Sequence, residues 1–499
     1  MARAYIKLKH LVALAVLTAS ILVVACDPEN VDLAGGGIGG SGVTSGPISG
    51  FGSVFVNGLE IDTSNASFTI NGVTGNEDML DVGMVVTVYG DLDNDTLDGT
   101  ATHVAFDFDV IGLVEAIDKT LNHIEVAGQS VTYDDLTIFK STDEASLQIG
   151  DYIAISGLSD ADSHVLARYI TTATPGEYSY QGSSTGGGSG STAPGSNSSL
   201  ATIEGFVQNL DIVNRRFNIG SLVVDYTSAQ FVDIEGAAIK DGLAVRVTGN
   251  KGATLHAAYI QATGIASALR ANKDVIVDGF VTGLDLPDGF ALKGSPIVIT
   301  PDTEFDNGKL ADIVLNKRVK VVGRSDDQNR IVAGKISFLP PAVFLIVADV
   351  TSVNLVAREF SLLGIDVTVN SSTAFLDRTL LGLRRFSLKD VGIGDRIAVI
   401  GFRSGAGIIA RRVDRLPGIF SNAVVLRGPV ALSSGNTEIT VLDKTIDISR
   451  LRDNQDFLDA AGTPISRQDL VSQVAVDSLV VVEGTYNGVT IDPTRIAIQ

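Results

Sequence analysis

Several residue types that enzymes commonly use are rare in this chain. Its 499 residues include one Cys, five His, three Met and no Trp, and aromatic residues make up 6%. With a single Cys, no disulfide can form within the chain. Lys and Arg total 37 against 58 Asp and Glu, which gives a net charge of −21. This balance argues against nucleic acid as a partner, because clustered Lys and Arg bind phosphate backbones.

Catalytic motifs are missing or fall in the wrong context. The sequence contains no His-Glu-x-x-His pair and no phosphate-binding loop ending in Gly-Lys-Ser or Gly-Lys-Thr. A Gly-x-Ser-x-Gly string at 182–186 lies inside a Gly/Ser-rich stretch, without the strand and helix of a nucleophile elbow. A Gly-x-Gly-x-x-Gly match at 37–42 has no preceding strand. We therefore expect a protein that is not an enzyme and has no catalytic residues.

The N-terminus has the features of a secretory signal. Basic residues precede a mostly apolar run over 11–25 that is too short to span a bilayer comfortably as a helix. The run ends at Cys26, the only Cys of the chain, in a context that resembles the bacterial lipobox. That resemblance implies that Cys26 is lipidated and becomes the mature N-terminus; the alternative is a buried free thiol. Asp27 resembles an inner-membrane retention signal, but sorting rules differ among bacteria, so the inner and outer membranes both remain candidates.

A strand-like segment recurs along the rest of the chain. In each copy a turn-forming residue precedes a β-branched run that ends in glycine seven positions later. The copies span 83–90, 150–157, 242–249, 316–323, 394–401 and 477–484. Gly begins four copies, and Asn316 and Asp477, which tolerate a left-handed backbone, begin the other two. The first position therefore predicts a turn with positive φ.

Each unit offers about five short strands, which is the size of a small OB-like barrel. We predict an all-β fold, a tandem array of about six small OB-like five-stranded β-barrel units after a lipoprotein signal peptide. Blades of one propeller or a continuous solenoid are the alternatives. We favour separate barrels because a Gly/Ser stretch breaks the chain between the second and third units.

The predicted domain organisation follows from the repeats and from the composition of the linkers. A signal peptide covers 1–25, a lipidated Cys with a Gly-rich tether covers 26–46, and a Gly/Ser linker covers 175–200. The β units are expected at 47–106, 107–174, 201–263, 264–339, 340–417 and 418–499.

The segment at 35–58, GGGIGGSGVTSGPISGFGSVFVNG, supports a family resemblance. It is similar to the opening of proteobacterial lipoproteins built from tandem copies of an uncharacterised domain of unknown function. The strand pattern extends this resemblance over most of the mature chain. The resemblance implies an envelope location and small β-barrel repeats, and it implies no activity or active site.

After each repeat glycine and a loop of varying length comes a small or turn-forming residue, at Ala101, Ala167, Ala257, Ala333, Ala410 and Pro493. The position two residues after this small residue varies among ionisable and aromatic residues. It holds His103, Tyr169, Tyr259, Lys335, Arg412 and Arg495. We predict that this position faces solvent, because water accommodates such different polar side chains equally well.

Acidic residues gather in the loop after the first repeat glycine. Asp91, Asp93, Asp95 and Asp98 are spaced along a run of turn-forming residues. Carboxylates on a turn suit Ca²⁺, which takes about six to eight oxygen ligands. The helix-loop-helix calcium pattern is broken, because threonines stand where it needs Gly and a bidentate Glu. The quartet is a candidate Ca²⁺ site with a solvated hairpin loop as the alternative, and we expect no other cofactor.

These observations favour a non-enzymatic cell-envelope lipoprotein whose tandem barrels bind a ligand or partner. We expect an N-terminal lipid to anchor the chain to the inner or outer membrane, with the body in the periplasm or at the cell surface. The partner would be an envelope protein or a polysaccharide, and not a nucleic acid. The alternatives are a structural spacer or envelope assembly factor, a Ca²⁺-binding surface or adhesion protein, and an enzyme with a site between units.

Overall fold

The computed structural model describes residues 42–178, 199–232, 234, 238–265, 269–404, 407–418, 422–432, 437–474 and 478–499. Within them the chain consists mainly of β-strands, with one short α-helix and three 3₁₀ helices. None of the helices in this part of the chain has the length and apolarity needed to cross a membrane. The predicted signal peptide, Cys26 and most of the two Gly-rich linkers lie outside the described residues.

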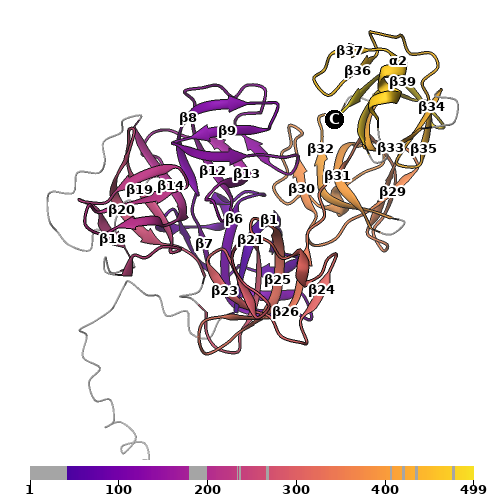
Figure 1. The fold of residues 1–499 in the computed structure, drawn as a ribbon. Helices are drawn as coiled ribbons and strands as arrows, with labels where there is room; N and C mark the ends of the chain where they lie inside the picture. Colours follow the sequence, from indigo (N-terminus) through magenta and orange to yellow (C-terminus); the bar gives the residue numbers. More distant parts are fainter. Residues whose placement is uncertain are drawn as a thin grey trace, which may run out of the picture. The chain divides into compact units, whose positions relative to one another are not determined.

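The first group of strands, drawn in indigo in Figure 1, is paired into a closed barrel. It contains β1 (Gly42–Gly50), β2 (Val54–Val56), β3 (Leu59–Asp62), β4 (Ser67–Ile70), β5 (Val73–Gly75), η1 (Glu77–Met79), β6 (Val85–Asp93) and β7 (Asp98–Phe106). β1 pairs antiparallel with β2 and β6, β2 with β3, and β6 with β7, while β3 runs parallel to β7. The ring β1-β2-β3-β7-β6 is thus a closed five-stranded barrel of the OB-like size.

Four more groups repeat this pairing order. The β8–β13 barrel contains β8 (Val110–Asp118), β9 (His123–Val126), β10 (Gln129–Thr132), β11 (Ile138–Lys140), β12 (Tyr152–Ser159) and β13 (Val165–Thr172). The β14–β20 barrel contains β14 (Leu200–Phe206), β15 (Gln208–Asp211), β16 (Arg216–Ile219), β17 (Leu222–Asp225), β18 (Gln230–Val232), β19 (Ala244–Lys251) and β20 (Leu255–Ala262). Its first strand is divided in two, so that β14 pairs with β19 and β15 pairs with β16.

The next two barrels keep the same order of strands. The β21–β26 barrel contains β21 (Asp274–Asp285), β22 (Gly289–Leu292), β23 (Ser295–Val298), β24 (Glu304–Asp306), η4 (Leu310–Asp312), β25 (Arg318–Ser325) and β26 (Ile331–Phe338). The β27–β32 barrel contains β27 (Phe344–Asn354), β28 (Glu359–Leu362), β29 (Ile365–Thr368), β30 (Ala374–Asp377), η5 (Leu388–Asp390), β31 (Arg396–Ser404) and β32 (Gly407–Arg415).

The last group departs from this order. It contains β33 (Ala423–Leu432), β34 (Glu438–Val441), β35 (Lys444–Asp447), β36 (Phe457–Leu458), β37 (Pro464–Ile465), α2 (Arg467–Gln473), β38 (Leu479–Tyr486) and β39 (Ile491–Ile498). In its described residues β39 pairs with β36 and β38 and not with β35, so the ring of hydrogen bonds is interrupted there. The predicted all-β fold of tandem five-stranded OB-like barrels is confirmed.

The repeat glycine marks a β-bulge. Between β12 and β13, Ser156 faces Tyr169 and Gly157 faces Ala167, which leaves Arg168 as the extra residue. A Cβ on Gly157 would lie 2.6 Å from the carbonyl oxygen of Leu166, so the bulge has room only for glycine. At the equivalent glycines 90, 249, 323, 401 and 484 a Cβ would lie 2.1, 2.1, 2.2, 2.3 and 2.5 Å from a carbonyl oxygen of the partner strand.

The predicted left-handed turn before each of these strands is also present. The first residue of the repeat has φ of 94° at Gly83 and 63° at Asn316, and φ is likewise positive at the copies that begin at 150, 242 and 394. The remaining copy begins at Asp477, which lies outside the described residues. The turn is therefore confirmed at every described position.

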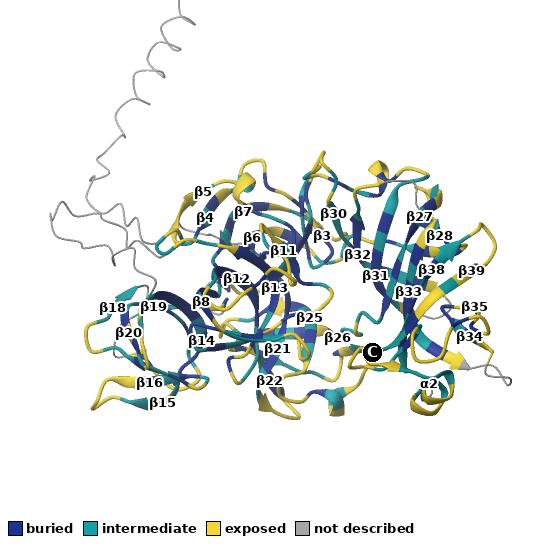
Figure 2. Ribbon diagram, turned by 90° about the horizontal axis from the view of Figure 1, so that it is seen from above, coloured by how far each residue is buried: buried dark blue, intermediate teal, exposed yellow. Residues whose placement is uncertain are grey.

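Alternating apolar residues fill the barrels. In β25, Val319 and Val321 are fully buried, while Arg318, Lys320 and Val322, which alternate with them, are partly exposed. Across the barrels, buried residues are concentrated on the strands and exposed residues on the hairpin turns (Figure 2). This period of two is the pattern expected when one face of a strand meets a core.

The barrels are also joined through their first strands. β1 runs parallel to β21, and β8 and β27 pair antiparallel with β14 and β33. The β8–β14 pairing connects barrels on either side of the predicted Gly/Ser linker. These joints cover outward-facing polar residues such as Ser45 and Thr202, which are buried.

Candidate functional site

The bulges place two arginines in one cavity. Arg168 is the extra residue between β12 and β13, and Arg411 is the extra residue between β31 and β32. A bulge changes the direction of its side chains and often lies beside a functional site. Both side chains line a cavity of about 280 Å³ to which the β1–β7, β8–β13, β21–β26 and β27–β32 barrels contribute.

The cavity is rich in cations. It is lined by Arg168, Arg318, Lys320, Arg411 and Arg412. Three of these arginines hold a carboxylate with two hydrogen bonds: Arg168 binds Asp134 at 3.0 and 2.8 Å, Arg318 binds Asp278 at 2.9 and 2.6 Å, and Arg412 binds Asp414 at 2.7 and 2.6 Å. Such bidentate pairs fix the guanidinium groups in place.

Lys320 and Arg411 have no such partner. Neither side chain makes a hydrogen bond or an ion pair to any residue in the described part of the chain, although the Arg411 guanidinium lies 4.8 Å from the centre of the Phe402 ring. The Nε atoms of Arg168 and Arg411 are buried, and neither has a hydrogen-bond partner in the described residues. The five cationic side chains of the lining and the three carboxylates paired with them together carry a net charge of +2.

The electrostatics agree with this count. Burial lowers the pKa of Lys320, and the nearby Arg411 charge lowers it further, while the carboxylate of Asp278 opposes these effects at both Lys320 and Arg411. Burial also lowers the pKa of Arg411, with the positive charges of Arg318 and Arg168 acting in the same direction. Buried charges without compensation destabilise the folded state, and an anion in the cavity would relieve that cost.

The walls of the cavity are partly apolar. They include Leu136 and Ile138 at β11 and the Pro340-Pro341-Ala342 segment that leads to β27. The arrangement therefore suits a small anion, or the anionic end of a larger molecule that also carries apolar atoms. No candidate nucleophile or acid–base pair was assigned to this cavity from the sequence.

The predicted calcium ligands lie on the hairpin between β6 and β7. The Asp93 carboxylate accepts hydrogen bonds from the backbone N–H groups of Asp95 at 2.8 Å and Thr96 at 3.0 Å, which lower its pKa. Asp91, Asp93, Asp95 and Asp98 all line one open pocket. Asp93 and Asp98 already accept hydrogen bonds that shape the turn, and the calcium site stays a prediction.

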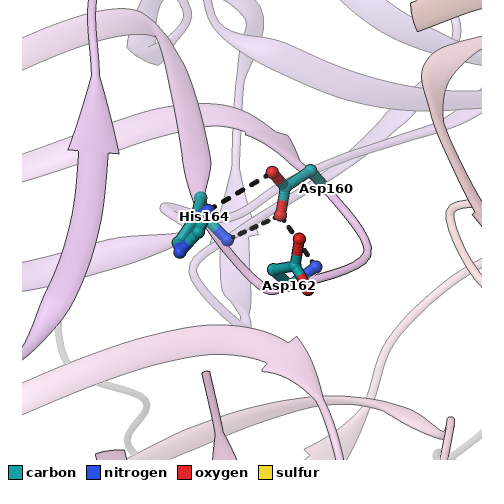
Figure 3. Close-up of side chains that lie close together, drawn as sticks. All are labelled: Asp160, Asp162 and His164. Atoms are coloured by element: carbon teal, nitrogen blue, oxygen red, sulfur yellow. Dashed lines mark hydrogen bonds and ion pairs between the residues drawn. The ribbon is translucent and has the colours of Figure 1, made fainter. Parts of the chain in front are cut away.

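A different trio has its potential metal-binding atoms closer together. The ligand atoms of Asp160, Asp162 and His164 lie within 4.8 Å of one another in the loop between β12 and β13 (Figure 3). The Asp160 carboxylate accepts the backbone N–H groups of Asp162 at 2.9 Å and His164 at 2.8 Å, while Asp162 accepts a hydrogen bond from Asn316 at 2.7 Å. These bonds account for the arrangement without an ion. The Asp-x-Asp-x-His spacing was the sequence signal for this trio.

The predicted exposure of the variable repeat position is wrong at two residues. Tyr169 is only 3% exposed and Arg412 only 7%. Tyr169 donates to the Asp81 carboxylate at 2.8 Å, and Arg412 donates to the carbonyl oxygens of Asp135 and Thr137, both at 2.9 Å. The position faces outward from its own barrel, but a neighbouring barrel covers it. The neighbouring residues Arg168 and Arg411 were overlooked, although both follow the small residue of the repeat directly.

The fold defines a class of proteins built from small closed β-barrels in tandem. Residues 42–105, 111–171, 278–337 and 349–414 match the family described as "Domain of unknown function (DUF5666)". Because these matches cover just over half of its length, the chain belongs to this family. The resemblance to tandem copies of an uncharacterised domain is thereby confirmed.

Other comparisons add little. No curated protein matches the chain. A solved structure titled "drosophila Unr CSD456" is 14% identical, and the match covers 47% of this chain and 97% of that one. Its TM-score of 0.12 is too low to support any argument about fold or function.

Proposed function

We propose that this protein is a non-enzymatic, lipid-anchored binding protein of the bacterial cell envelope, and that it holds an anionic ligand in the cavity lined by Arg168, Lys320 and Arg411. The cavity itself carries the proposal, because Lys320 and Arg411 place two uncompensated positive charges there. The lipid anchor is inferred from the sequence around Cys26 alone.

The overall charge of the chain supports a specific site. A protein with a net charge of −21 repels free anions at long range, so affinity has to come from local contacts. Hydrogen bonds to charged groups contribute about 1.5–3 kcal/mol each. Two such contacts, from Lys320 and Arg411, are enough for a useful affinity for a small anion.

The test uses the mature chain and isothermal titration calorimetry with two probes, inorganic phosphate and hexyl phosphate. We expect hexyl phosphate to bind more tightly, because its alkyl chain can contact Leu136 and the proline segment. Arg411→Gln and Lys320→Gln should each weaken binding roughly 10-fold or more, since each removes one charged hydrogen bond.

Arg216→Gln is the matched control. Arg216 lies on β16 with a half-exposed side chain and does not line the cavity. An equal loss in this control would indicate that the probes respond to overall charge. Absence of binding to the wild type at millimolar probe would overturn the proposal and favour the structural-spacer alternative.

A further inference from the structure

A second cavity lies at a different junction and has the opposite charge balance. It measures about 230 Å³ and shares no lining residue with the cationic cavity. Its charged lining groups are Asp107, Asp109, Glu204, Arg246 and Lys293. Three carboxylates face two cations, which leaves a net charge of −1.

Arg246 accounts for two of the carboxylates. Its guanidinium group lies 2.8 Å from Asp107 and 2.6 Å from Glu204. The charges of these two carboxylates raise the pKa of Arg246, against the opposing effect of burial. Asp107 and Glu204 therefore share the single cation Arg246 and keep a net charge of −1 with it, and Asp109 remains outside these ion pairs.

Asp109 forms no ion pair with any described residue. One oxygen of its carboxylate accepts the backbone N–H of Gly157 at 2.7 Å. Lys293 lines the same cavity, but its ammonium group donates to the hydroxyl of Ser45 at 3.2 Å and forms no ion pair within the described part of the chain. Asp109 is thus the one carboxylate of the lining that has no ion pair among the described residues.

Three other polar atoms in the lining are buried and have no hydrogen-bond partner among the residues that the structure describes. They are the Nε of Arg246, the hydroxyl of Ser159 and the hydroxyl of Thr263. A buried polar group without a partner destabilises the folded state. Three of them around one cavity indicate a polar occupant that both donates and accepts hydrogen bonds.

We propose that this cavity binds a small primary ammonium compound that also carries a hydroxyl group, with the ammonium on Asp109 and the hydroxyl among Arg246, Ser159 and Thr263. A metal ion fits less well, because the only group of three or more ligand atoms close enough for one in the described chain is the Asp160 trio. The proposed site is independent of the anion site, since the two cavities have no lining residue in common.

The titration of Asp109 provides a readout. Burial, followed by the charge of Glu204, raises the pKa of Asp109 to about 7. Arg246, Lys293 and the Gly157 N–H favour its charged form, while Asp107 faces Arg246. A bound ammonium favours the ionised carboxylate, so binding at pH 7 should release about half a proton.

The experiment is isothermal titration calorimetry of the mature chain with ethanolamine, ethylammonium and ethylene glycol. We expect ethanolamine to bind at least 10-fold more tightly than either analogue, because ethylammonium lacks the hydroxyl and ethylene glycol lacks the charge. Between pH 6 and pH 5 the affinity for ethanolamine should fall nearly 10-fold, because the ionised fraction of Asp109 falls by that factor below its pKa. Buffers of different ionisation enthalpy measure the released proton.

Asp109→Asn is the decisive variant, because its amide oxygen can still accept the Gly157 N–H. We expect it to lose ethanolamine binding and proton release, while Asp327→Asn, at an exposed residue outside the cavity, retains both. Unchanged binding in Asp109→Asn, affinity independent of pH, or no ethanolamine binding by the wild type would each overturn the proposal. None of these results alters the test of the anion site, which uses different residues and probes.

Discussion

Replacing Gly249 with Ala tests whether the bulge dictates the repeat glycine. The new Cβ would lie 2.1 Å from the carbonyl oxygen of His256 and 2.9 Å from the Cα of Ala257. Both atoms belong to the backbone of β20, which pairs with β19 on both sides of the bulge. Relief of the clash therefore requires the strand itself to move.

The expected cost follows from that geometry. Overpacking a filled interior typically costs 1–3 kcal/mol. We expect Gly249→Ala to cost about 3 kcal/mol, at the upper end of that range, because backbone has to yield instead of a flexible side chain. A loss of this size corresponds to an increase of roughly 100-fold in the local opening constant of β19 and β20.

Hydrogen exchange of the intact chain, read by mass spectrometry, measures this opening in peptides from β19 and β20. Gly252→Ala is the control, since its Cβ meets nothing closer than the Thr254 carbonyl oxygen at 3.8 Å. Gly242→Ala has free space but a φ of 81°, and it should cost about 1 kcal/mol through backbone strain. If β19 exchanges its amide hydrogens as slowly in Gly249→Ala as in Gly252→Ala, the lack of room for a Cβ is not the reason for glycine at position 249.

Two further predictions concern sites inferred from the sequence. Cys26→Ala should move the chain out of the detergent phase in a partitioning assay, because acyl chains supply the stable membrane attachment; unchanged partitioning would contradict lipidation. If Asp93 and Asp95 bind Ca²⁺, a hundredfold excess over Kd should stabilise the mature chain by about 2.7 kcal/mol in thermal melts. NaCl of equal ionic strength is the control, and a gain that persists in Asp93→Asn/Asp95→Asn would leave only a solvated loop.

The fold was predictable from the sequence wherever the local backbone conformation restricts which residue type can occupy a position. A bulge that leaves 2.1 Å for a Cβ admits only glycine, so a glycine recurs at the same place, as at Gly90 and Gly249. A left-handed turn admits Gly or Asn, which is why Asn316 could stand for glycine. Alternation of apolar residues then indicated short strands with one buried face.

The charged cavities depended on contacts between residues far apart in the sequence. Arg168 and Arg411 belong to different barrels, and no local pattern indicates that their side chains line the same space. Asp109 and Glu204 likewise face one cavity from two barrels. Such sites are formed by contacts between barrels, whereas the local sequence pattern specifies only the strands and turns within each barrel.

The sequence by itself determined that the chain is all-β, built from repeats and strongly acidic. It could not determine which outward faces remain in water. Arg412 and Tyr169 occupy outward positions of their barrels, yet neighbouring barrels bury them. The pairing of first strands, such as β8 with β14, depends on matching edges that lie far apart along the chain. Only the tertiary structure decided this pairing, because the alternation within a strand records that one face is buried and not what covers the other.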